Sequence, residues 1–314
     1  MKPITIGKLR GLQTCASPRG TFTCLALDHR QNLRKANPRF QDDAELSRFK
    51  LDVTAELAPH ATSVLLDPQV SAAQAIAAGK LPGERAFVVA VESTGYSGEA
   101  TARKGQVIPG WSVEKAKRMG ASMIKLLVYY HPDSPTAAEA EAFTAQIAAE
   151  SIQYDLGLML EPLSYSLSEA PLTGDEKRYV VVEAARRLTR IPGVDLLKAE
   201  FPLSSNSPES DWPAACAELS AASVTPWIVL SAAVSFDLYL KQVSAACQAG
   251  ASGVAVGRAV WQEAVTLAGP ARLDFLRSTA RERLTRLNAL CQALAKPFTG
   301  FYTAEAPFDW YRNY

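Results

Sequence analysis

Clusters of cysteine and histidine are missing from this sequence, and their absence weighs against two kinds of site. The five cysteines are scattered and odd in number, and no two of them form a Cys-x-x-Cys pair. A disulfide framework or a zinc site is therefore not expected. The three histidines, His29, His60 and His131, stand far apart. We accordingly expect neither a catalytic metal nor a cofactor.

The chain also lacks an excess of charge, a long apolar run and a dinucleotide-binding motif. Its 33 basic and 32 acidic side chains leave a net charge of +1, which gives no reason to expect nucleic acid or a membrane surface as a partner. No run of 18 apolar residues occurs, and the N-terminus has no apolar signal core. We therefore expect a cytoplasmic protein without a membrane span. No Gly-x-Gly-x-x-Gly follows the first expected strand, which argues against dinucleotide binding.

What the sequence does contain is a regular alternation of short apolar strands and helical segments. Strands are expected near residues 21–27, 62–66, 86–91, 122–129, 158–161, 194–201, 227–230 and 253–256. Helices are expected near residues 43–57, 70–78, 113–119, 136–154, 175–188, 212–222, 236–249 and 259–294. Nearly continuous apolar strands are typical of a parallel sheet that helices cover on both faces.

Eight such units predict an α/β protein with a single (β/α)₈ TIM barrel. We assign one domain to residues 1–314, with the barrel at about 21–266 and a C-terminal helical and aromatic extension at about 267–314. The tail from residue 298 is rich in aromatic residues. It either caps the barrel or packs against a second subunit, and we expect a homo-oligomer.

Two lysines lie inside apolar strands, which is the most unusual feature of the sequence. Lys125 stands in the strand near 122–129 and Lys198 in the strand near 194–201. Each buried cation loses its solvation and the two repel each other, so both effects lower a lysine pKa. A neutral lysine amine can attack a ketone and form a Schiff base. Two interior lysines therefore suggest an enzyme with an amine nucleophile.

Carboxylates at the ends of other strands could assist that chemistry, because the reactive residues of such barrels lie at the carboxyl ends of the strands. Glu161 could move protons while the Schiff base forms, and Asp28 could polarise a substrate hydroxyl. For Lys198 the alternative is a structural ion pair with Glu161 or Glu200. A helix cap or a loop ion pair is the preferred interpretation for any one of Asp67, Glu92 and Glu200.

The loops after the seventh and eighth strands fit a phosphate site, since such loops commonly bind phosphate through backbone N–H groups and a helix N-terminus. The first loop contains Ser231 and Ala232, and the second contains Gly257 and Arg258. The glycine would allow close approach and the arginine would add charge. A plain strand-to-helix turn is the alternative for Gly257 and Arg258.

A series of short motifs resembles the tagatose 1,6-bisphosphate aldolase family, which consists of metal-independent class I barrel aldolases and includes the sulfofructosephosphate aldolases. The motifs run in order from about residue 21 to 295 and lie at residues 25–30, 63–68, 92–96, 124–130, 160–162, 197–202, 230–234 and 257–261. The resemblance implies that Lys198 is the Schiff-base lysine and that Lys125, Glu161 and Asp28 are its catalytic partners. It also implies phosphate binding through Ser231, Gly257 and Arg258.

The resemblance leaves the substrate open among related ketose 1-phosphates. Its members usually have glutamine at the position of His29 and glycine at that of Ala233. The first interpretation is cleavage of tagatose 1,6-bisphosphate to dihydroxyacetone phosphate and glyceraldehyde 3-phosphate. Sulfofructosephosphate aldolase activity, giving dihydroxyacetone phosphate and 3-sulfolactaldehyde, is the alternative, and a non-catalytic barrel that senses a sugar phosphate is the second. Candidates for binding the group on C6 are Arg30, Arg103 and Lys104.

Overall fold

Eight parallel strands close into a barrel in the computed structural model of the chain, which describes residues 1–168, 170–312 and 314. The strands follow one another around the barrel in sequence order, and the last pairs with the first. They are β2 (Phe22–Ala26), β3 (Ser63–Leu66), β4 (Ala86–Ala90), β5 (Met123–Tyr130), β6 (Gly157–Ser164), β7 (Leu196–Ala199), β8 (Trp227–Leu230) and β9 (Gly253–Val256). The predicted TIM barrel is confirmed.

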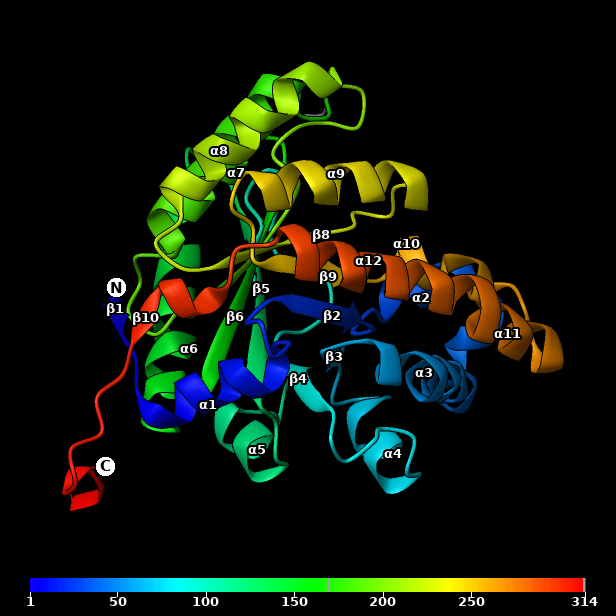
Figure 1. Cartoon of the computed structure of the whole chain (residues 1–314). Coiled ribbons are helices and arrows are strands. Elements are labelled where there is room, and N and C mark those ends of the chain that lie inside the picture. Colours follow the sequence, from blue (N-terminus) through cyan, green and yellow to red (C-terminus); the bar gives the residue numbers. More distant parts are fainter. Residues whose placement is uncertain (169, 313) are drawn as a thin grey trace.

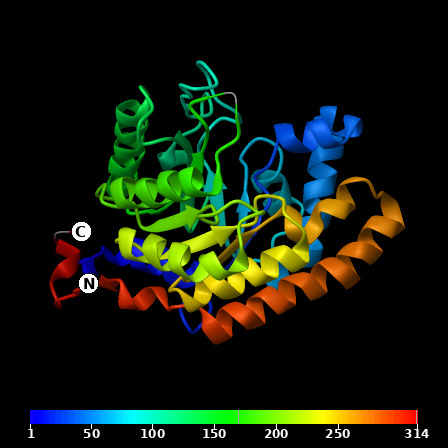
Figure 2. The same ribbon diagram turned by 90° about the horizontal axis from the view of Figure 1, so that it is seen from above.

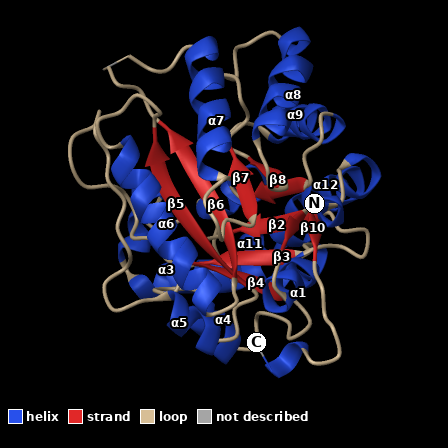
Figure 3. Ribbon diagram, turned by 90° about the vertical axis from the view of Figure 1, so that its left-hand side faces the viewer, coloured by secondary structure: helices blue, strands red, loops and turns tan. Residues whose placement is uncertain are grey.

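Helices surround the strands, as Figure 3 shows with helices in blue and strands in red. Those that follow the barrel strands include α3 (Asp43–Leu57), α4 (Ala72–Ala77), α5 (Val113–Arg118), α6 (Ala137–Gln153), α7 (Gly174–Leu188), α8 (Trp212–Ala222), α9 (Phe236–Gln248) and α10 (Arg258–Trp261). The chain continues through α11 (Gly269–Phe275) and α12 (Arg281–Leu294), and α12 lies against α9 (Figure 1). Within the described residues, no helix combines the length and apolar character that a bilayer span requires.

Strand residues divide into two apolar layers because successive side chains point to opposite faces of a sheet. One layer packs between the strands and the surrounding helices, and contains for example Val64, Ile124 and Leu197. The other fills the barrel interior and includes Phe22, Cys24, Leu65, Val88, Met123, Met159, Leu196 and Ile228. Filling by side chains makes the interior a packed core rather than a channel.

Helix α1 (Ile6–Cys15) and the segment that follows α12 join the interior layer. Leu12 and Cys15 of α1, together with Phe298 and Tyr302, pack against the interior strand residues. Two short strands, β1 (Lys2–Pro3) and β10 (Tyr302–Thr303), pair with each other beside them. Both ends of the chain consequently lie on the same side of the molecule (Figure 1, Figure 2). Two roles were considered for the tail. Its first part, which contains Phe298 and Tyr302, caps the barrel.

The strand and helix predictions differ from the structure mainly toward the two ends of the chain. Helices α1 and α2 (Gln31–Ala36) and the short β1 and β10 strands were not predicted. For α3 and α8, the predicted and observed bounds agree. Residues 31–36 are mostly exposed, with Leu33 the buried member of α2, so they offer no apolar periodicity to detect.

Candidate active site

The reactive side chains stand on the same face of their strands as the interior apolar layer. Met123, Met159 and Leu196 belong to that layer. Lys125, Glu161 and Lys198 each follow one of these residues by two positions. Because side chains two residues apart in a strand point to the same face, all three point into the barrel. The strands thus place two amines and a carboxylate at the carboxyl end of the barrel, directly above its apolar filling.

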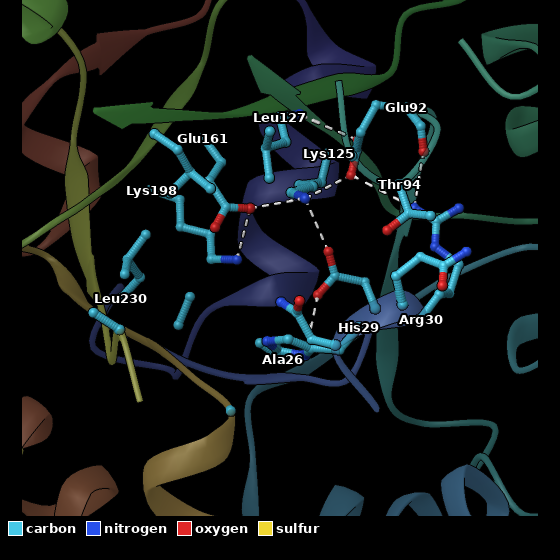
Figure 4. A pocket seen from close by; sticks show the side chains of 18 of the residues that line it. Ala26, His29, Arg30, Glu92, Thr94, Lys125, Leu127, Glu161, Lys198 and Leu230 are labelled. Carbon is cyan, nitrogen blue, oxygen red and sulfur yellow. Dashed lines mark hydrogen bonds and ion pairs between the residues drawn. The ribbon is translucent and has the colours of Figure 1, made fainter. Parts of the chain in front are cut away.

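Lys125 is enclosed by three carboxylates. Its Nζ lies 2.7 Å from Glu92 Oε1, 2.8 Å from Glu161 Oε2 and 2.9 Å from Asp28 Oδ2. The other carboxylate oxygen of Glu92 accepts a hydrogen bond of 3.1 Å from the backbone N–H of Leu127. Figure 4 shows the Lys125 ammonium between Glu92 and Glu161. The side chain of Lys125 is 1% exposed, so these carboxylates replace nearly all of its solvation.

The close charges decide the protonation of this cluster. Burial alone would lower the pKa of Lys125, but Asp28, Glu161 and Glu92 outweigh it and hold that pKa well above its usual range. The repulsion expected from two interior lysines is therefore offset at Lys125. Burial would raise the pKa of both Asp28 and Glu161, yet Lys125 and Lys198 lower it. At Glu92 burial prevails and the pKa is raised.

Lys198 lies on the other side of Glu161. Its Nζ is 2.9 Å from Glu161 Oε2, the same oxygen that contacts Lys125 (Figure 4). One carboxylate oxygen thus contacts the side-chain nitrogens of both lysines. This is the ion pair with Glu161 that was the alternative interpretation for Lys198, and it is also the geometry in which a carboxylate can exchange a proton with an amine.

The two loops expected to bind phosphate lie beside Lys198. Gly257 follows β9, and a Cβ atom there would come within 2.9 Å of the Ala26 carbonyl oxygen, so only glycine fits. Arg258 starts α10, and among the described residues no carboxylate lies within ion-pair distance of its guanidinium. In the loop after β8, Ala232 and Ala233 have φ angles of 43° and 61°, a left-handed conformation that is costly for alanine.

His29 lies between Asp28 and Gly257, with its Nδ1 4.0 Å from Asp28 Oδ1. Its ring packs edge-on against Trp261, with the centroids 5.4 Å apart. Burial lowers the pKa of His29 to about 4, with Arg258 acting in the same direction and Asp28 opposing it. The imidazole is therefore neutral near pH 7.

One cavity of about 630 Å³ brings together nine of the eleven candidate site residues named from the sequence. It is lined by Asp28, Arg30, Lys125, Glu161, Lys198, Ser231, Ala232, Gly257 and Arg258. The guanidinium of Arg30 donates to Gln69 Oε1 at 2.8 Å and to the Glu92 carbonyl oxygen at 2.9 Å.

Arg103 and Lys104 do not line this cavity. They border a separate one of about 300 Å³ on the far side of Tyr129. Their assignment as residues that touch a group on C6 is not supported by this placement.

Glu92 is the site residue that sequence reasoning set aside, in favour of a cap or a loop ion pair. It was recognisable as the strand-end acid two residues beyond Ala90, but nothing local distinguishes it from Asp67. In the structure Asp67 pairs with the fully buried Lys50 and accepts backbone N–H groups from Gln69 and Val70. Asp67 therefore has the structural role that was expected for it, whereas Glu92 contacts Lys125.

A cation is already present where the acidic side chains converge. Asp28, Glu92 and Glu161 all point at the ammonium of Lys125. In the described part of the chain, no three histidine, cysteine, aspartate or glutamate side chains are grouped as metal ligands.

The family model described as DeoC/LacD family aldolase matches residues 22–263, which cover the whole barrel. The chain belongs to this aldolase family. It is therefore an aldolase, a carbon–carbon lyase, and the resemblance seen in its motifs is confirmed.

Two curated members of the family are similar over nearly their full length. Tagatose 1,6-diphosphate aldolase 2 of Enterococcus faecalis is 32% identical, with 94% of this chain and 96% of the relative covered. Tagatose 1,6-diphosphate aldolase of Listeria monocytogenes is 29% identical, with 95% of each covered.

Solved aldolase structures share the fold. An archaeal fructose 1,6-bisphosphate aldolase superposes with a TM-score of 0.60 at 23% identity, covering 89% of this chain and 99% of the other. Fructose-bisphosphate aldolase of Plasmodium falciparum superposes with a TM-score of 0.71 at 15% identity, covering 94% and 98%. These likenesses concern the barrel itself.

Proposed function

We propose that this family member is a class I aldolase, in which Lys198 forms a Schiff base with the ketone carbon of a ketose 1-phosphate. One observation carries the proposal. The Lys198 amine is buried inside the cavity with Glu161 Oε2 2.9 Å away, so a nucleophile and a proton carrier lie in contact.

Schiff-base formation moves two protons from the lysine nitrogen to the carbonyl oxygen, and Glu161 carries one of them. It takes a proton from the Lys198 ammonium, and the neutral amine then attacks C2 of the ketose. The C=O π bond breaks as the C–N bond forms, and the oxygen takes one of the two protons on the nitrogen, which gives a neutral carbinolamine. Glu161 returns the proton to the carbinolamine hydroxyl, which leaves as water, and the nitrogen lone pair completes the iminium.

Bond cleavage then uses the iminium as an electron sink. Asp28, which Lys125 and Lys198 keep ionised, accepts the proton of the C4 hydroxyl. The C3–C4 bond breaks, its electron pair moves toward the iminium, and the aldehyde leaves an enamine on Lys198. Transfer of this proton from Asp28 to C3, followed by hydrolysis of the iminium by water, releases dihydroxyacetone phosphate and regenerates the lysine.

The C1 phosphate is held at the ends of β8 and β9. Arg258 offers a guanidinium without a carboxylate partner among the described residues, and Gly257 lets the backbone come close. Ser231 and Ala232 line the same side of the cavity. A phosphate there would compensate the charge of Arg258.

The proposed substrate is tagatose 1,6-bisphosphate, which yields dihydroxyacetone phosphate and glyceraldehyde 3-phosphate. The two family members that are similar over nearly their full length are named for this sugar. Residues 226–231 and 257–261 resemble the sulfofructosephosphate aldolases at least as much as they resemble the tagatose 1,6-bisphosphate aldolases. The alternative substrate is therefore 6-deoxy-6-sulfofructose 1-phosphate. We also propose that the protein acts in the cytoplasm, as a homo-oligomer.

Borohydride trapping tests the chemistry. In the presence of dihydroxyacetone phosphate, borohydride should reduce the imine and attach the three-carbon unit to the peptide containing Lys198. Lys198→Met should abolish the label. A label on Lys125 would show that Lys125, not Lys198, is the nucleophile. An unlabelled protein would refute the Schiff-base mechanism.

A turnover comparison tests the substrate. The rates to compare are those with tagatose 1,6-bisphosphate, fructose 1,6-bisphosphate and 6-deoxy-6-sulfofructose 1-phosphate. A higher kcat/KM for the sulfosugar would replace the proposed substrate by the alternative.

A further inference from the structure

The loop between β4 and α5, residues 91–112, folds back on itself beside the cavity. Ser97 and Lys104 exchange backbone hydrogen bonds of 3.0 and 2.9 Å, and the N–H of Ser93 donates to the Gln106 carbonyl oxygen at 2.8 Å. This pairing makes the loop a small antiparallel hairpin. Its first arm, with Thr94 visible in Figure 4 and Tyr96 further along, lines the cavity.

Arg103 lies on the second arm of this hairpin, behind the cavity wall. Its guanidinium carbon is 4.5 Å from the ring centroid of Tyr96, 4.8 Å from that of Tyr165 and 5.5 Å from that of Tyr129. These distances are within the range of cation–π attraction. The three rings come from the hairpin, from the end of β5 and from the segment after β6. One side chain thus joins three separate segments.

Two of these rings form part of the cavity wall. Tyr96 and Tyr129 both line the cavity, and they contact each other edge to face with their centroids 5.2 Å apart. Tyr165 is buried and donates a hydrogen bond of 2.7 Å to Ser134 Oγ, which fixes the back of the arrangement. Tyr96 is 43% exposed, so packing alone holds it weakly.

The guanidinium of Arg103 contacts these three rings. Its backbone carbonyl accepts from Thr136 Oγ1 at 3.2 Å and its Nε donates to the Ala100 carbonyl oxygen at 2.9 Å. Among the described residues, no carboxylate is within ion-pair distance of its guanidinium, whereas the neighbouring Lys104 pairs with Glu139 at 2.7 Å. The two cations of this arm therefore differ in what they contact.

The position of this wall in the barrel indicates which part of the substrate it meets. In the closed barrel order, β4 and β5 lie opposite β8 and β9. The proposed function, on which this inference rests, places the C1 phosphate at β8 and β9 and C2 at Lys198. The carbons beyond the cleaved bond then extend across the cavity toward Tyr96 and Tyr129.

We propose that Arg103 is a positioning residue for the aldol reaction, which acts by holding Tyr96 and Tyr129 as the wall that orients the aldehyde half of the substrate. It does not touch the substrate or Lys198. Substitution of Arg103 should therefore impair steps that involve the aldehyde portion of the substrate. Steps that involve only dihydroxyacetone phosphate should remain intact.

Two measurements on the full-length protein separate these halves. Exchange of the C3 proton of dihydroxyacetone phosphate with deuterium oxide requires the phosphate site, the Schiff base and a group that removes the proton, but not the aldehyde half of the substrate. Cleavage of the ketose bisphosphate also requires the tyrosine wall. For Arg103→Met we expect proton exchange within about twofold of wild type and a KM for the ketose raised about tenfold, with a smaller change in kcat.

Further variants make the comparison specific. Arg103→Lys keeps the charge but loses the planar group that stacks on rings, so it should recover part of the KM effect. Lys104→Met removes a cation from the same arm without affecting the rings, and should match wild type. Tyr96→Leu should reproduce the KM increase without changing Arg103, which covers the case that Arg103→Met does not fold.

Three results would overturn the assignment. One is an equal fall of exchange and cleavage in both Arg103→Met and Tyr96→Leu, because that would mean a general disruption of the site. Another is an unchanged KM in both variants. Wild-type protein that neither exchanges the proton nor is trapped by borohydride would refute the proposed function, and this inference with it.

Discussion

At the scale of single residues, the site is defined by the ratio of two lysines to three carboxylates. Lys125 and Lys198 face Asp28, Glu92 and Glu161, and Glu161 Oε2 contacts both amines. With all five groups ionised the cluster carries one more negative than positive charge. The raised pKa of Glu92, caused by burial, makes it the most easily protonated of the three. The surrounding charge thus favours an ammonium at Lys125, whereas Lys198 has one carboxylate, that of Glu161, within ion-pair distance among the described residues.

His29 should make the folded protein sensitive to mild acid. Its pKa is about 4 when folded and about 6.5 when unfolded. Between these values the unfolded chain binds more protons, so the free energy of unfolding falls as the pH drops from about 6.5 to 4. The contribution of His29 to this loss is up to about 3 kcal/mol. His29→Gln should therefore lose less stability over this range, as urea unfolding at several pH values can measure.

The more exposed His60 provides the control for this experiment. It lies in the short 3₁₀ turn Ala58–His60 and is half-buried. His60→Gln should change the pH dependence of unfolding less than His29→Gln does. Identical pH profiles for wild type and His29→Gln would show that the half-buried imidazole is not held neutral.

At the scale of elements, the loop between β8 and α9 departs most from ordinary backbone geometry. Ala232 and Ala233 are both left-handed, although alanine adopts this conformation at a cost of about 1–2 kcal/mol per residue. The next turn is secured, because Ser235 caps α9 by accepting the N–H of Leu238. Both alanines lie beside the proposed phosphate site, where local strain commonly persists when surrounding structure holds it.

Glycine at position 233 should relieve part of this strain. Ala233→Gly is expected to raise the free energy of unfolding by up to about 1 kcal/mol, because the lost steric penalty exceeds the added chain entropy of glycine. Chemical denaturation measures the change. The matched control is Ala142→Gly, within α6 on an exposed face, where the same substitution should lower stability by about 0.5–1 kcal/mol. Destabilisation of similar size in both variants would argue against strain at Ala233.

At the scale of the whole molecule, α1 and the segment after α12 close the end of the barrel opposite the cavity. A buried lysine anchors this closure. Lys8 Nζ contacts Asp195 Oδ2 at 2.8 Å, the Gly193 carbonyl oxygen at 2.9 Å and Ser151 Oγ at 3.0 Å. Asp195 also accepts the backbone N–H of Leu158 at 2.9 Å. Helix α1 is thereby connected to β6 and to the residue that precedes β7.

Removing this lysine should destabilise the whole barrel. Lys8→Met leaves Asp195 as a buried carboxylate without its cation, which typically costs about 3–5 kcal/mol. Thermal and chemical unfolding should show the loss. The double variant Lys8→Met with Asp195→Asn should recover part of it, and Lys117→Met, on the exposed surface of α5, should change little. A single variant as stable as wild type would mean that apolar packing alone holds α1 in place.

The number of barrel units and the position of the reactive residues within the strands were determined by the sequence itself. Both depend on local properties, namely the alternation of apolar segments and the in-strand location of Lys125, Glu161 and Lys198. A strand's alternation also determines that these three share the inner face with Met123 and its neighbours. Short-range periodicity is readable without knowing the fold.

Only the tertiary structure decided which strand-end acids meet the lysines. Glu92 and Asp67 look alike in sequence, yet Glu92 contacts Lys125 while Asp67 pairs with Lys50. Likewise, Leu12 and Cys15 of helix α1 share one buried core with Phe298, although they are far apart in the sequence. Such contacts depend on how the sheet closes into a barrel and on which segments pack into the barrel interior. These are long-range constraints, and no local run of residues carries them.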